Sequence, residues 1–159
     1  MKRFLPIALL LLPLLTACDG KTILDEERLF DGDVWNRFTP EEFELTVDNA
    51  DNYYNIDFTI AVDTNRYRYD ALPVMIILTS PGGEERQFYG NVPLMEKGRP
   101  RGELHGACRV ATGRIRSYFS FNSQGKHRMA VSQATSQYDL EGIHSLSVSV
   151  TRAKLDYDL

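Results

Sequence analysis

The sequence predicts an all-β domain, an antiparallel β-sandwich of about seven or eight strands, with a barrel-like closure as the alternative. Short segments that alternate apolar and polar residues recur at a spacing of roughly ten residues after position 42. Clusters of Gly, Pro, Asn and Asp separate these segments, and no long amphipathic helix pattern follows the first 20 residues. Period-two segments joined by turns are typical of a half-buried antiparallel sheet.

The chain begins with a secretory leader. The basic pair Lys2-Arg3 precedes an apolar run at 4–17, which is shorter than the roughly 20 residues of a membrane-spanning helix. The run ends in Leu15-Thr16-Ala17 directly before Cys18, which matches the lipobox of bacterial lipoproteins. We therefore predict a signal peptide at 1–17 and acylation of the Cys18 sulfur, which anchors the chain to a membrane. The alternative is an ordinary signal peptide and a secreted protein with two thiols.

The mature chain is expected to contain one domain. Residues 18–37 are polar and acidic without a sustained period, so we predict a lipidated cysteine and an acidic tether there, followed by the β-sandwich domain at 38–155. Removal of Lys2 and Arg3 with the leader changes the formal charge from −4 to −6. A net negative charge argues against a nucleic-acid partner.

The first strands are expected at 42–47 and 54–62, where apolar residues occupy every second position. The connection between them, residues 48–52, has turn composition, so the two strands are predicted to pair as a hairpin. Residues 74–78 are continuously apolar and indicate a strand covered on both faces. A long loop is expected at 91–102, and further strands follow around Ile115 to Phe121, Met129 to Val131 and Leu146 to Val150.

Charge is distributed unevenly along the chain. Residues 19–57 carry twelve acidic and three basic residues, whereas Lys97 to Arg128 carries eight basic residues and one acid. The two segments cancel if they lie side by side in a sandwich; alternatively, the basic segment forms a face for an acidic partner. The candidate partner-binding residues are Lys97, Arg99, Arg101, Arg114 and Arg116.

The sequence contains no catalytic or metal-binding motif. His105, His127 and His144 lack the spacing of a metal site. Cys108 lies near His105, but no neighbouring residue is identified that would orient a nucleophile, so we interpret this thiol as a small buried hydrophobe. We predict a protein without enzymatic activity, catalytic residues, metal or cofactor.

Aromatic residues offer a second kind of binding site, because their rings stack on sugars. Several are expected in the core or beside loops, so a glycan-binding platform is the alternative rather than the leading interpretation. The residues concerned are Trp35, Tyr53, Tyr54, Tyr67, Tyr69 and Tyr89.

Several segments recur in a recognisable order. Trp35 precedes the strands, and Tyr67-Arg68-Tyr69-Asp70 precedes the apolar strand. The C-terminal part contains Gly125-Lys126-His127-Arg128, Val131-Ser132-Gln133 and Leu140-Glu141-Gly142-Ile143, with His127 or Arg128 where an aromatic is usual. This order resembles the GldH gliding-motility lipoproteins of the Bacteroidota. The matching residues are Trp35, Tyr67, Tyr69, Gly125, Gln133, Leu140, Gly142 and Ile143.

Two of these residues have physical roles that their chemistry suggests. Gly142 suits a turn with positive φ before the last strand, and the amide of Gln133 suits backbone groups left unpaired at a strand end.

The resemblance implies an envelope lipoprotein that serves gliding motility and the associated secretion through protein–protein contacts, with a membrane and envelope proteins as partners. In these bacteria, surface delivery of lipoproteins is associated with an acidic cluster directly after the lipidated cysteine. No such cluster directly follows Cys18, so a periplasm-facing domain is expected. The alternative function is a glycan- or ligand-binding surface lipoprotein of a gut-type member of that group.

Overall fold

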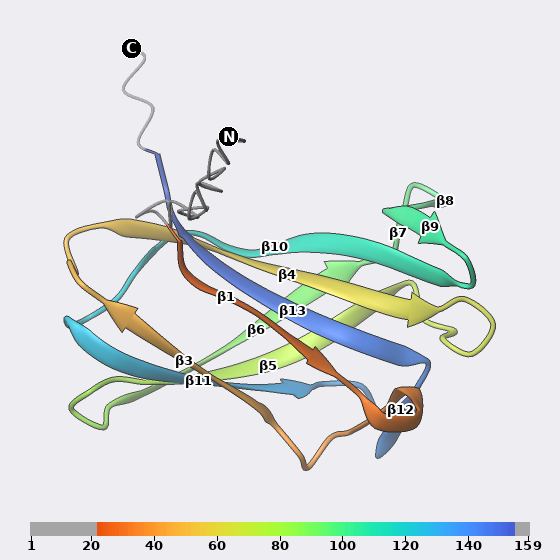
Figure 1. Ribbon diagram of the computed structural model, residues 1–159, viewed down its shortest axis with the longest axis horizontal. Coiled ribbons are helices and arrows are strands. Elements are labelled where there is room, and N and C mark those ends of the chain that lie inside the picture. The colour runs from red at the N-terminus through yellow and green to blue at the C-terminus, as the bar shows by residue number, and fades with distance from the viewer. Residues whose placement is uncertain (1–21, 155–159) are drawn as a thin grey trace, which may run out of the picture.

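The computed structural model describes residues 22–154 as two antiparallel sheets packed face to face, so the predicted β-sandwich is confirmed (Figure 1). The first sheet contains, in spatial order, β1 (Thr22–Leu29), β13 (Ile143–Arg152), β4 (Tyr53–Asp63), β10 (Cys108–Ser120) and β9 (Glu103–His105). The second contains β3 (Glu41–Val47), β11 (Gly125–Gln133), β5 (Ala71–Thr79) and β6 (Glu85–Pro93). Two small ladders pair β2 (Val34–Asn36) with β12 (Asp139–Glu141) and β7 (Met95–Glu96) with β8 (Arg99–Pro100), and a short 3-10 turn, η1, spans Asp31–Asp33.

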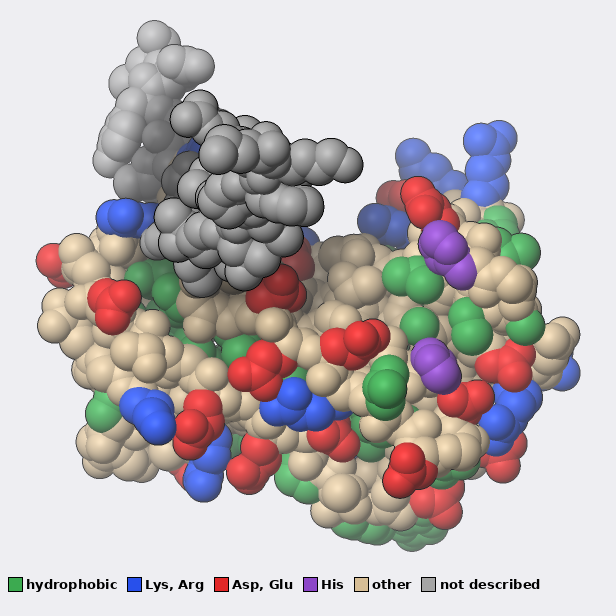
Figure 2. Space-filling view, in the orientation of Figure 1, with side chains coloured by type: hydrophobic (Ala, Val, Ile, Leu, Met, Phe, Trp, Pro, Cys, Tyr) green, Lys and Arg blue, Asp and Glu red, His purple; other side chains and the backbone are tan. Residues whose placement is uncertain are grey.

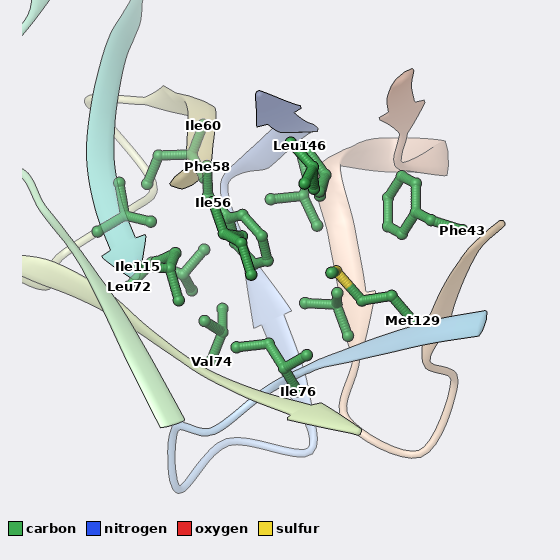
Figure 3. Close-up of a cluster of buried hydrophobic side chains, with 14 of the residues drawn as sticks. Phe43, Ile56, Phe58, Ile60, Leu72, Val74, Ile76, Ile115, Met129 and Leu146 are labelled. Atoms are coloured by element: carbon green, nitrogen blue, oxygen red, sulfur yellow. The ribbon is translucent and has the colours of Figure 1, made fainter. Parts of the chain in front are cut away.

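The core lies between the two sheets and is built by the alternation seen in the sequence. Ile56, Phe58 and Ile60 of β4 are fully buried and point toward the second sheet (Figure 3). Leu72, Val74 and Ile76 are also fully buried and come from β5 in the opposite layer (Figure 3). Burying a side chain of this size stabilises the fold by about 1.5–3 kcal/mol, so the strand faces that meet here hold the two layers together.

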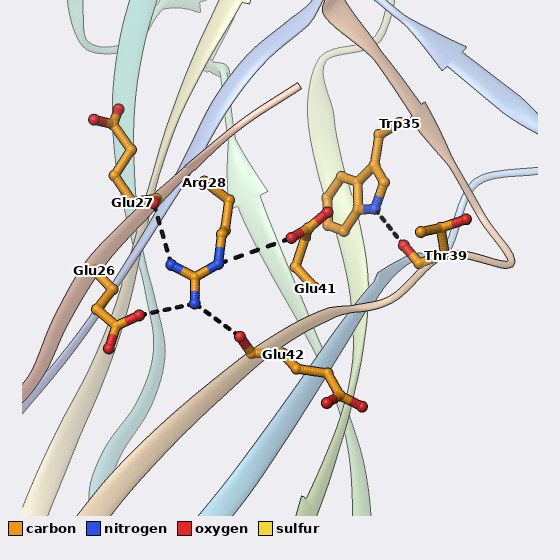
Figure 4. A network of polar contacts seen from close by, with 7 residues as sticks. All are labelled: Glu26, Glu27, Arg28, Trp35, Thr39, Glu41 and Glu42. Atoms are coloured by element: carbon orange, nitrogen blue, oxygen red, sulfur yellow. Dashed lines mark hydrogen bonds and ion pairs between the residues drawn. The ribbon is translucent and has the colours of Figure 1, made fainter. Parts of the chain in front are cut away.

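The edge strands of the two sheets are joined by Arg28 of β1 (Figure 4). Its Nη2 donates to Glu26 Oε2 at 2.8 Å and to the Glu42 carbonyl of β3 at 2.9 Å. Its guanidinium also lies 4.5 Å from the centre of the Phe43 ring. Burial raises the pKa of the Glu41 carboxyl, and the charge of Arg28, 3.9 Å away, acts in the opposite direction. One cation therefore satisfies groups from both layers.

The tether predicted at 18–37 does not extend over the described residues 22–37: they include β1, η1 and β2, so the sandwich includes residues before the predicted start at 38. Strand β1 pairs with β13 over Thr22 to Leu29, and Trp35 of β2 is only 1% exposed. The alternation was hidden because β1 is an edge strand with a charged surface; Leu24 is its one buried residue. Cys18 and the leader at 1–17 lie outside the described residues.

The hairpin predicted from 42–47 and 54–62 is also wrong, although both strands exist. β3 pairs with β11 in the second sheet, whereas β4 pairs with β10 and β13 in the first. The connection at 48–52 therefore crosses between layers. Period two shows which face of a strand is buried, but it does not show which strand lies beside it.

Two further differences concern the middle of the chain. Residues 74–78 form the centre of β5, but Met75 and Ile77 on its outer face are only half-buried. The expected loop at 91–102 contains the end of β6 and the β7–β8 hairpin. The continuous apolar run therefore predicted the strand correctly, but the prediction that both of its faces are covered was wrong.

Candidate functional site

Seven of the eight residues predicted as a family signature gather at one end of the sandwich. We call this the signature end; it comprises η1, β2, β12, Gly142 and the connections 64–70 and 134–138. The seven residues are Trp35, Tyr67, Tyr69, Gln133, Leu140, Gly142 and Ile143. Gly125 starts β11 at the opposite end, which we call the N-terminal end because β1 begins there; it includes the connections 48–52 and 121–124.

Gly142 forms the centre of the signature end. Its amide donates to the Asp33 carbonyl at 2.8 Å, and its carbonyl accepts from the Asp63 amide at 2.8 Å. Its φ is +84°, and an added Cβ would lie 2.6 Å from the Tyr67 nitrogen. Only glycine combines this conformation with so close an approach of two backbones, which agrees with the turn expected from the sequence.

Trp35 and Leu140 face each other across the β2–β12 ladder and are each 1% exposed. The indole Nε1 donates to the Thr39 carbonyl at 3.2 Å (Figure 4). The ring stacks on Phe30 with centroids 4.8 Å apart. This pair fixes the 37–40 connection onto the end of the core.

Gln133 is buried, with only 2% of its surface exposed. Its side-chain amide holds the 134–138 connection. Its Nε2 donates to the Gln137 carbonyl at 2.8 Å. Its Oε1 accepts from the amide of Thr135 at 2.8 Å and from the hydroxyl of the same residue at 2.7 Å. The sequence-derived role for this amide, binding backbone groups beyond a strand end, agrees with these bonds.

Tyr67 and Tyr69 shape the 64–70 connection. The Tyr67 hydroxyl donates to the Ala71 carbonyl at 2.8 Å, and the two rings meet edge to face at 5.5 Å. Burial raises the pKa of the Tyr67 hydroxyl, with a further contribution from Tyr69. Tyr67 is 6% exposed and Tyr69 is 41% exposed, so the first supports the connection and the second presents a ring to solvent.

A polar group links the same connection to η1. Arg66 lies 3.7 Å from Asp33 and 3.8 Å from Glu141, and it donates to the Gly32 carbonyl at 3.2 Å. Asp33 also contacts the His144 Nδ1 at 2.9 Å. These residues are partly exposed, so each pair adds at most about 1 kcal/mol.

A hollow of about 340 Å³ opens between the 64–70 connection, the β7–β8 hairpin and β10. Its apolar wall includes Tyr67, Leu94 and Met95, and its charged groups are Arg68, Asp70 and Arg109. A neighbouring hollow of about 230 Å³ shares Arg68 and Tyr69 and extends to Gln137 and Asp139. The signature end therefore carries two adjoining hollows that share Arg68 and Tyr69, and the larger of the two has apolar residues in its wall.

The predicted basic face divides into separate places. Lys97, Arg99 and Arg101 lie on the β7–β8 hairpin or directly after it, and Met95 and Pro100 of the same hairpin line the hollow of about 340 Å³. Lys97 and Gly98 have φ of +49° and +75°, which puts Lys97 in the tight turn at the tip. Arg101 lies 3.7 Å from Glu96. Within residues 22–154, no carboxylate lies within ion-pair distance of Lys97, Arg99, Arg68 or Arg109.

Arg114 and Arg116 do not belong to this hairpin group. Arg114 projects from the outer face of β10 and pairs with Asp57. Arg116 lies over the Phe88 ring at 4.8 Å and donates to the Ile115 carbonyl at 2.8 Å. Figure 2 shows basic side chains projecting where the hairpin lies and acidic side chains scattered across the middle of the same face. Of the five candidate cations, Lys97 and Arg99 are the two exposed side chains at the hairpin tip that have no carboxylate partner among the described residues.

Sequence reasoning missed an exposed aromatic pair at the signature end. Phe38 and Tyr138 are 72% and 66% exposed, and their rings stack 5.7 Å apart. The Arg37 amide donates to the Tyr138 carbonyl at 2.8 Å, which joins two connections a hundred residues apart in sequence. No local pattern could reveal this pair, because each residue alone is an ordinary loop aromatic.

The tyrosines do not form the flat platform considered for glycans. Tyr54 and Trp35 are 3% and 1% exposed. The exposed tyrosines are far apart in the fold: Tyr53 starts β4 at the N-terminal end, Tyr69 lies at the signature end, and Tyr89 projects from β6. These positions give no support to a stacking surface made of the predicted residues.

The remaining chemical groups are also placed. Cys108 is half-buried opposite His105 on the β9–β10 hairpin, and no hydrogen bond joins them in the described part of the chain. His105 instead lies 3.4 Å from Glu103. No cluster of three metal-ligating residues occurs between positions 22 and 154. No helix in that same stretch has the length and apolar character to cross a membrane.

The fold and the signature end define a β-sandwich module whose distinctive surface is made of connections. A solved structure with a similar arrangement is a carbohydrate-binding module specific for non-crystalline cellulose, CBM28, at 14% identity and a TM-score of 0.48, covering 84% of this chain and 76% of that one. No curated protein matches the sequence. The GldH lipoprotein family matches residues 22–150, and the chain belongs to that family.

Proposed function

We propose that this chain is a non-enzymatic lipoprotein of the cell envelope, anchored through Cys18 and facing the periplasm, that binds other envelope proteins with its signature end. In this proposal it is an accessory component of gliding-motility or secretion-associated machinery. Membership of the GldH lipoprotein family supports the lipoprotein class.

The observation that carries the binding role is the signature end itself. The carboxylate-free cations of the β7–β8 hairpin, the two adjoining hollows and the aromatic pair Phe38–Tyr138 lie around one end of the sandwich. Exposed aromatic rings and arginines are the side chains that most often dominate binding energy at protein interfaces. Free cations beside them favour an acidic partner surface.

A pull-down from detergent-solubilised membranes tests this role. The variant K97E/R99E is expected to lose most of the captured partner, because it reverses two exposed charges on the hairpin. The matched control K126E/R128E makes the same charge change on the outer face of β11, where both residues are also exposed. Equal capture by the two variants would remove the hairpin from the interface.

The aromatic half of the surface is tested separately by F38S/Y138S. Both rings are exposed, so the domain is expected to keep its unfolding midpoint within the error of the measurement while capture falls. A partner retained at wild-type yield would show that the pair takes no part in binding.

The anchor is tested by Cys18→Ala. This variant is expected to accumulate as an unprocessed precursor that incorporates no labelled fatty acid, because the acylated sulfur is absent. Normal maturation with normal lipid label would contradict the anchor, whatever the pull-down shows.

A further inference from the structure

The length of chain between the proposed anchor and the first strand is very short. Cys18 and Thr22 are separated by residues 19–21. An extended chain spans about 3.3–3.6 Å per residue, so the Cα atoms of Cys18 and Thr22 lie at most about 14 Å apart. The following inference rests on the proposed acylation of Cys18: the acyl chains keep Thr22 close to the bilayer surface.

Thr22 marks a definite end of the sandwich. It pairs with Thr151, whereas Leu29 at the other end of β1 pairs with Ser145. A strand rises about 3.3 Å per residue, so β1 carries the chain about 23 Å from Thr22 to Leu29. Figure 1 shows β1 running from the left of the view toward β12 on the right, which belongs to the signature end. An anchor beside Thr22 therefore places the signature end away from the lipid.

The N-terminal end presents side chains suited to a lipid surface. Tyr53 and Tyr118 are 43% and 53% exposed, and they come from the paired strands β4 and β10. Tyrosine combines an apolar ring with a polar hydroxyl, which is the reason for its enrichment at membrane interfaces. The neighbouring residues Tyr54 and Phe119 are buried in the core, so Tyr53 and Tyr118 face outward.

Tyr118 is exposed through a local distortion of β10. Its φ is +52°, which is uncommon for a residue with a side chain, and the register with β4 shifts between Arg116 and Phe119. The Tyr118 amide donates to the Asn55 side chain at 3.3 Å and so holds the bulge. A bulge of this kind redirects a side chain that a regular strand would place elsewhere.

The charges at this end are balanced. Arg152 and Lys154 are exposed near the end of β13, and Asp48 and Asp51 are exposed in the 48–52 connection. Lys126 and the acids Glu84 and Glu85 are exposed at this end as well. The cations therefore do not outnumber the acids, and the surface has no strong preference for anionic lipid. The tyrosines and the short connection to Cys18 are the features that favour contact with the headgroup layer.

We propose that the sandwich stands end-on at the membrane, with Tyr53 and Tyr118 in the headgroup layer of the bilayer and the signature end facing away. The bilayer contacts the N-terminal end, and the proposed protein partner binds the opposite end. A lipoprotein of this geometry presents its binding surface at a fixed height above the lipid.

Fluorescence quenching tests this orientation in the full-length acylated protein. A C108S background carries one bimane-labelled cysteine, D51C at the N-terminal end or K97C on the hairpin; both positions are exposed. The proteins are reconstituted into vesicles of phosphatidylethanolamine and phosphatidylglycerol that contain a headgroup nitroxide lipid. Quenching is expected to be several-fold stronger at position 51 than at 97. Equal quenching, or stronger quenching at 97, would overturn the proposal.

The tyrosines are tested in the same assay with the D51C label. Y53S/Y118S is expected to reduce quenching clearly, while Y89S, which removes a ring 59% exposed on β6, is expected to leave it unchanged. An unchanged signal in the double variant would exclude the tyrosines from the contact. Flotation with the vesicles separates the two proposals: wild type that fails to float contradicts the anchor, whereas wild type that floats with equal quenching contradicts only the orientation.

Discussion

The two ends of the sandwich are built in different ways. At the N-terminal end, which also includes the 80–84 connection beside Gly125, the backbone amides of the connections bond locally: the Asp51 amide donates to the Asn49 side chain at 2.9 Å, and the Glu84 amide donates to Ser80 Oγ at 3.1 Å. One side-chain bond, from Asn122 Nδ2 to Glu84 Oε2 at 2.7 Å, links two of these connections. At the signature end, connections hold one another. Gly142 bonds to both Asp33 and Asp63, and the side chain of Asn36 bonds to Asp139 at 2.7 Å.

This difference explains where the family-signature residues lie. A turn stabilised by its own residues tolerates many sequences, because several Asn, Asp, Ser and Gly combinations form the same bonds. Connections that depend on one another need a particular glycine, amide or indole at each meeting point. The signature residues at this end therefore maintain the shape of the surface on which the proposed interface is built.

The largest expected effect comes from comparing the signature glycines of the two ends. Gly142→Ala is expected to lower the free energy of unfolding by about 3 kcal/mol or more, because a positive φ and a collision with the Tyr67 backbone act together. Gly125 has a φ of +110°, and an added Cβ would meet only the Pro81 ring, at 3.0 Å. Gly125→Ala is therefore expected to lower the free energy of unfolding by about 1–2 kcal/mol. Urea unfolding measures both; equal losses would show that the backbone contact adds nothing.

The second comparison uses two buried polar residues on the inner face of β11. Gln133→Leu is expected to cost about 2–4 kcal/mol, because it leaves backbone groups of the 134–138 connection without partners. His127→Leu is expected to stay within about 1 kcal/mol of wild type, since it also removes a buried Nε2 that has no partner.

The physical difference lies in how fully each side chain is bonded. Of the two ring nitrogens of His127, only Nδ1 has a bond, to the Gly125 carbonyl at 3.1 Å, and the ring packs against Phe121 in an aromatic environment. Denaturant midpoints for both leucine variants decide the matter. A larger loss at 127 than at 133 would reverse the comparison.

The third effect appears at alkaline pH and concerns the signature end. Because the folded-state pKa of Tyr67 is raised, the native protein keeps a proton that the unfolded chain releases above its ordinary value near 10. Stability is therefore expected to fall as pH rises above about 10. Tyr67→Phe should lack this part of the decrease, while losing about 1 kcal/mol at neutral pH with the Ala71 hydrogen bond.

Thermal unfolding of wild type and Tyr67→Phe across this pH range measures the effect. The difference between the two curves isolates Tyr67 from the remaining tyrosines. Parallel curves would contradict the burial of the hydroxyl as the cause.

The smallest effect concerns the seam between β1 and β3, near the signature end, where Arg28 and Glu41 lie. Burial raises the pKa of Glu41, so the folded state binds its proton more tightly than the unfolded chain does. Stability from this group is present at low pH and is lost as pH rises through the interval above 4.5. Glu41→Gln is expected to change stability at neutral pH by less than about 1 kcal/mol, in the stabilising direction.

Unfolding curves at acidic and neutral pH give the sign for this seam. Relative to wild type, Glu41→Gln should be more stable at neutral pH than at acidic pH. A destabilised variant at neutral pH would mean that the attraction to Arg28 outweighs the cost of burial.

The sequence predicted the sandwich because period two is a local property. The alternation in β4, β5 and β11 follows from which side chains face the core, and each strand shows it within a few residues. Pairing is not local. β3 and β4 are adjacent in sequence but lie in different sheets, and no feature of residues 42–62 distinguishes this from a hairpin.

The candidate site was predicted residue by residue but not as a surface. Gly142 and Gln133 have the local roles that their chemistry suggested, whereas the five candidate cations proved to belong to three different environments. Phe38 and Tyr138 were missed because their pairing needs two distant connections to meet.

By itself, the sequence determined the fold class, the resemblance to the family and the prediction of a lipidated Cys18, because these depend on short patterns read along the chain. Tertiary structure alone decided that residues 22–36 belong to the domain and that the signature residues share one end. It also decided that β1 starts at the other end, where Tyr53 lies. The physical reason is that strand order and edge pairing are set by contacts between residues about a hundred positions apart, whose free energy leaves no periodic trace in either segment.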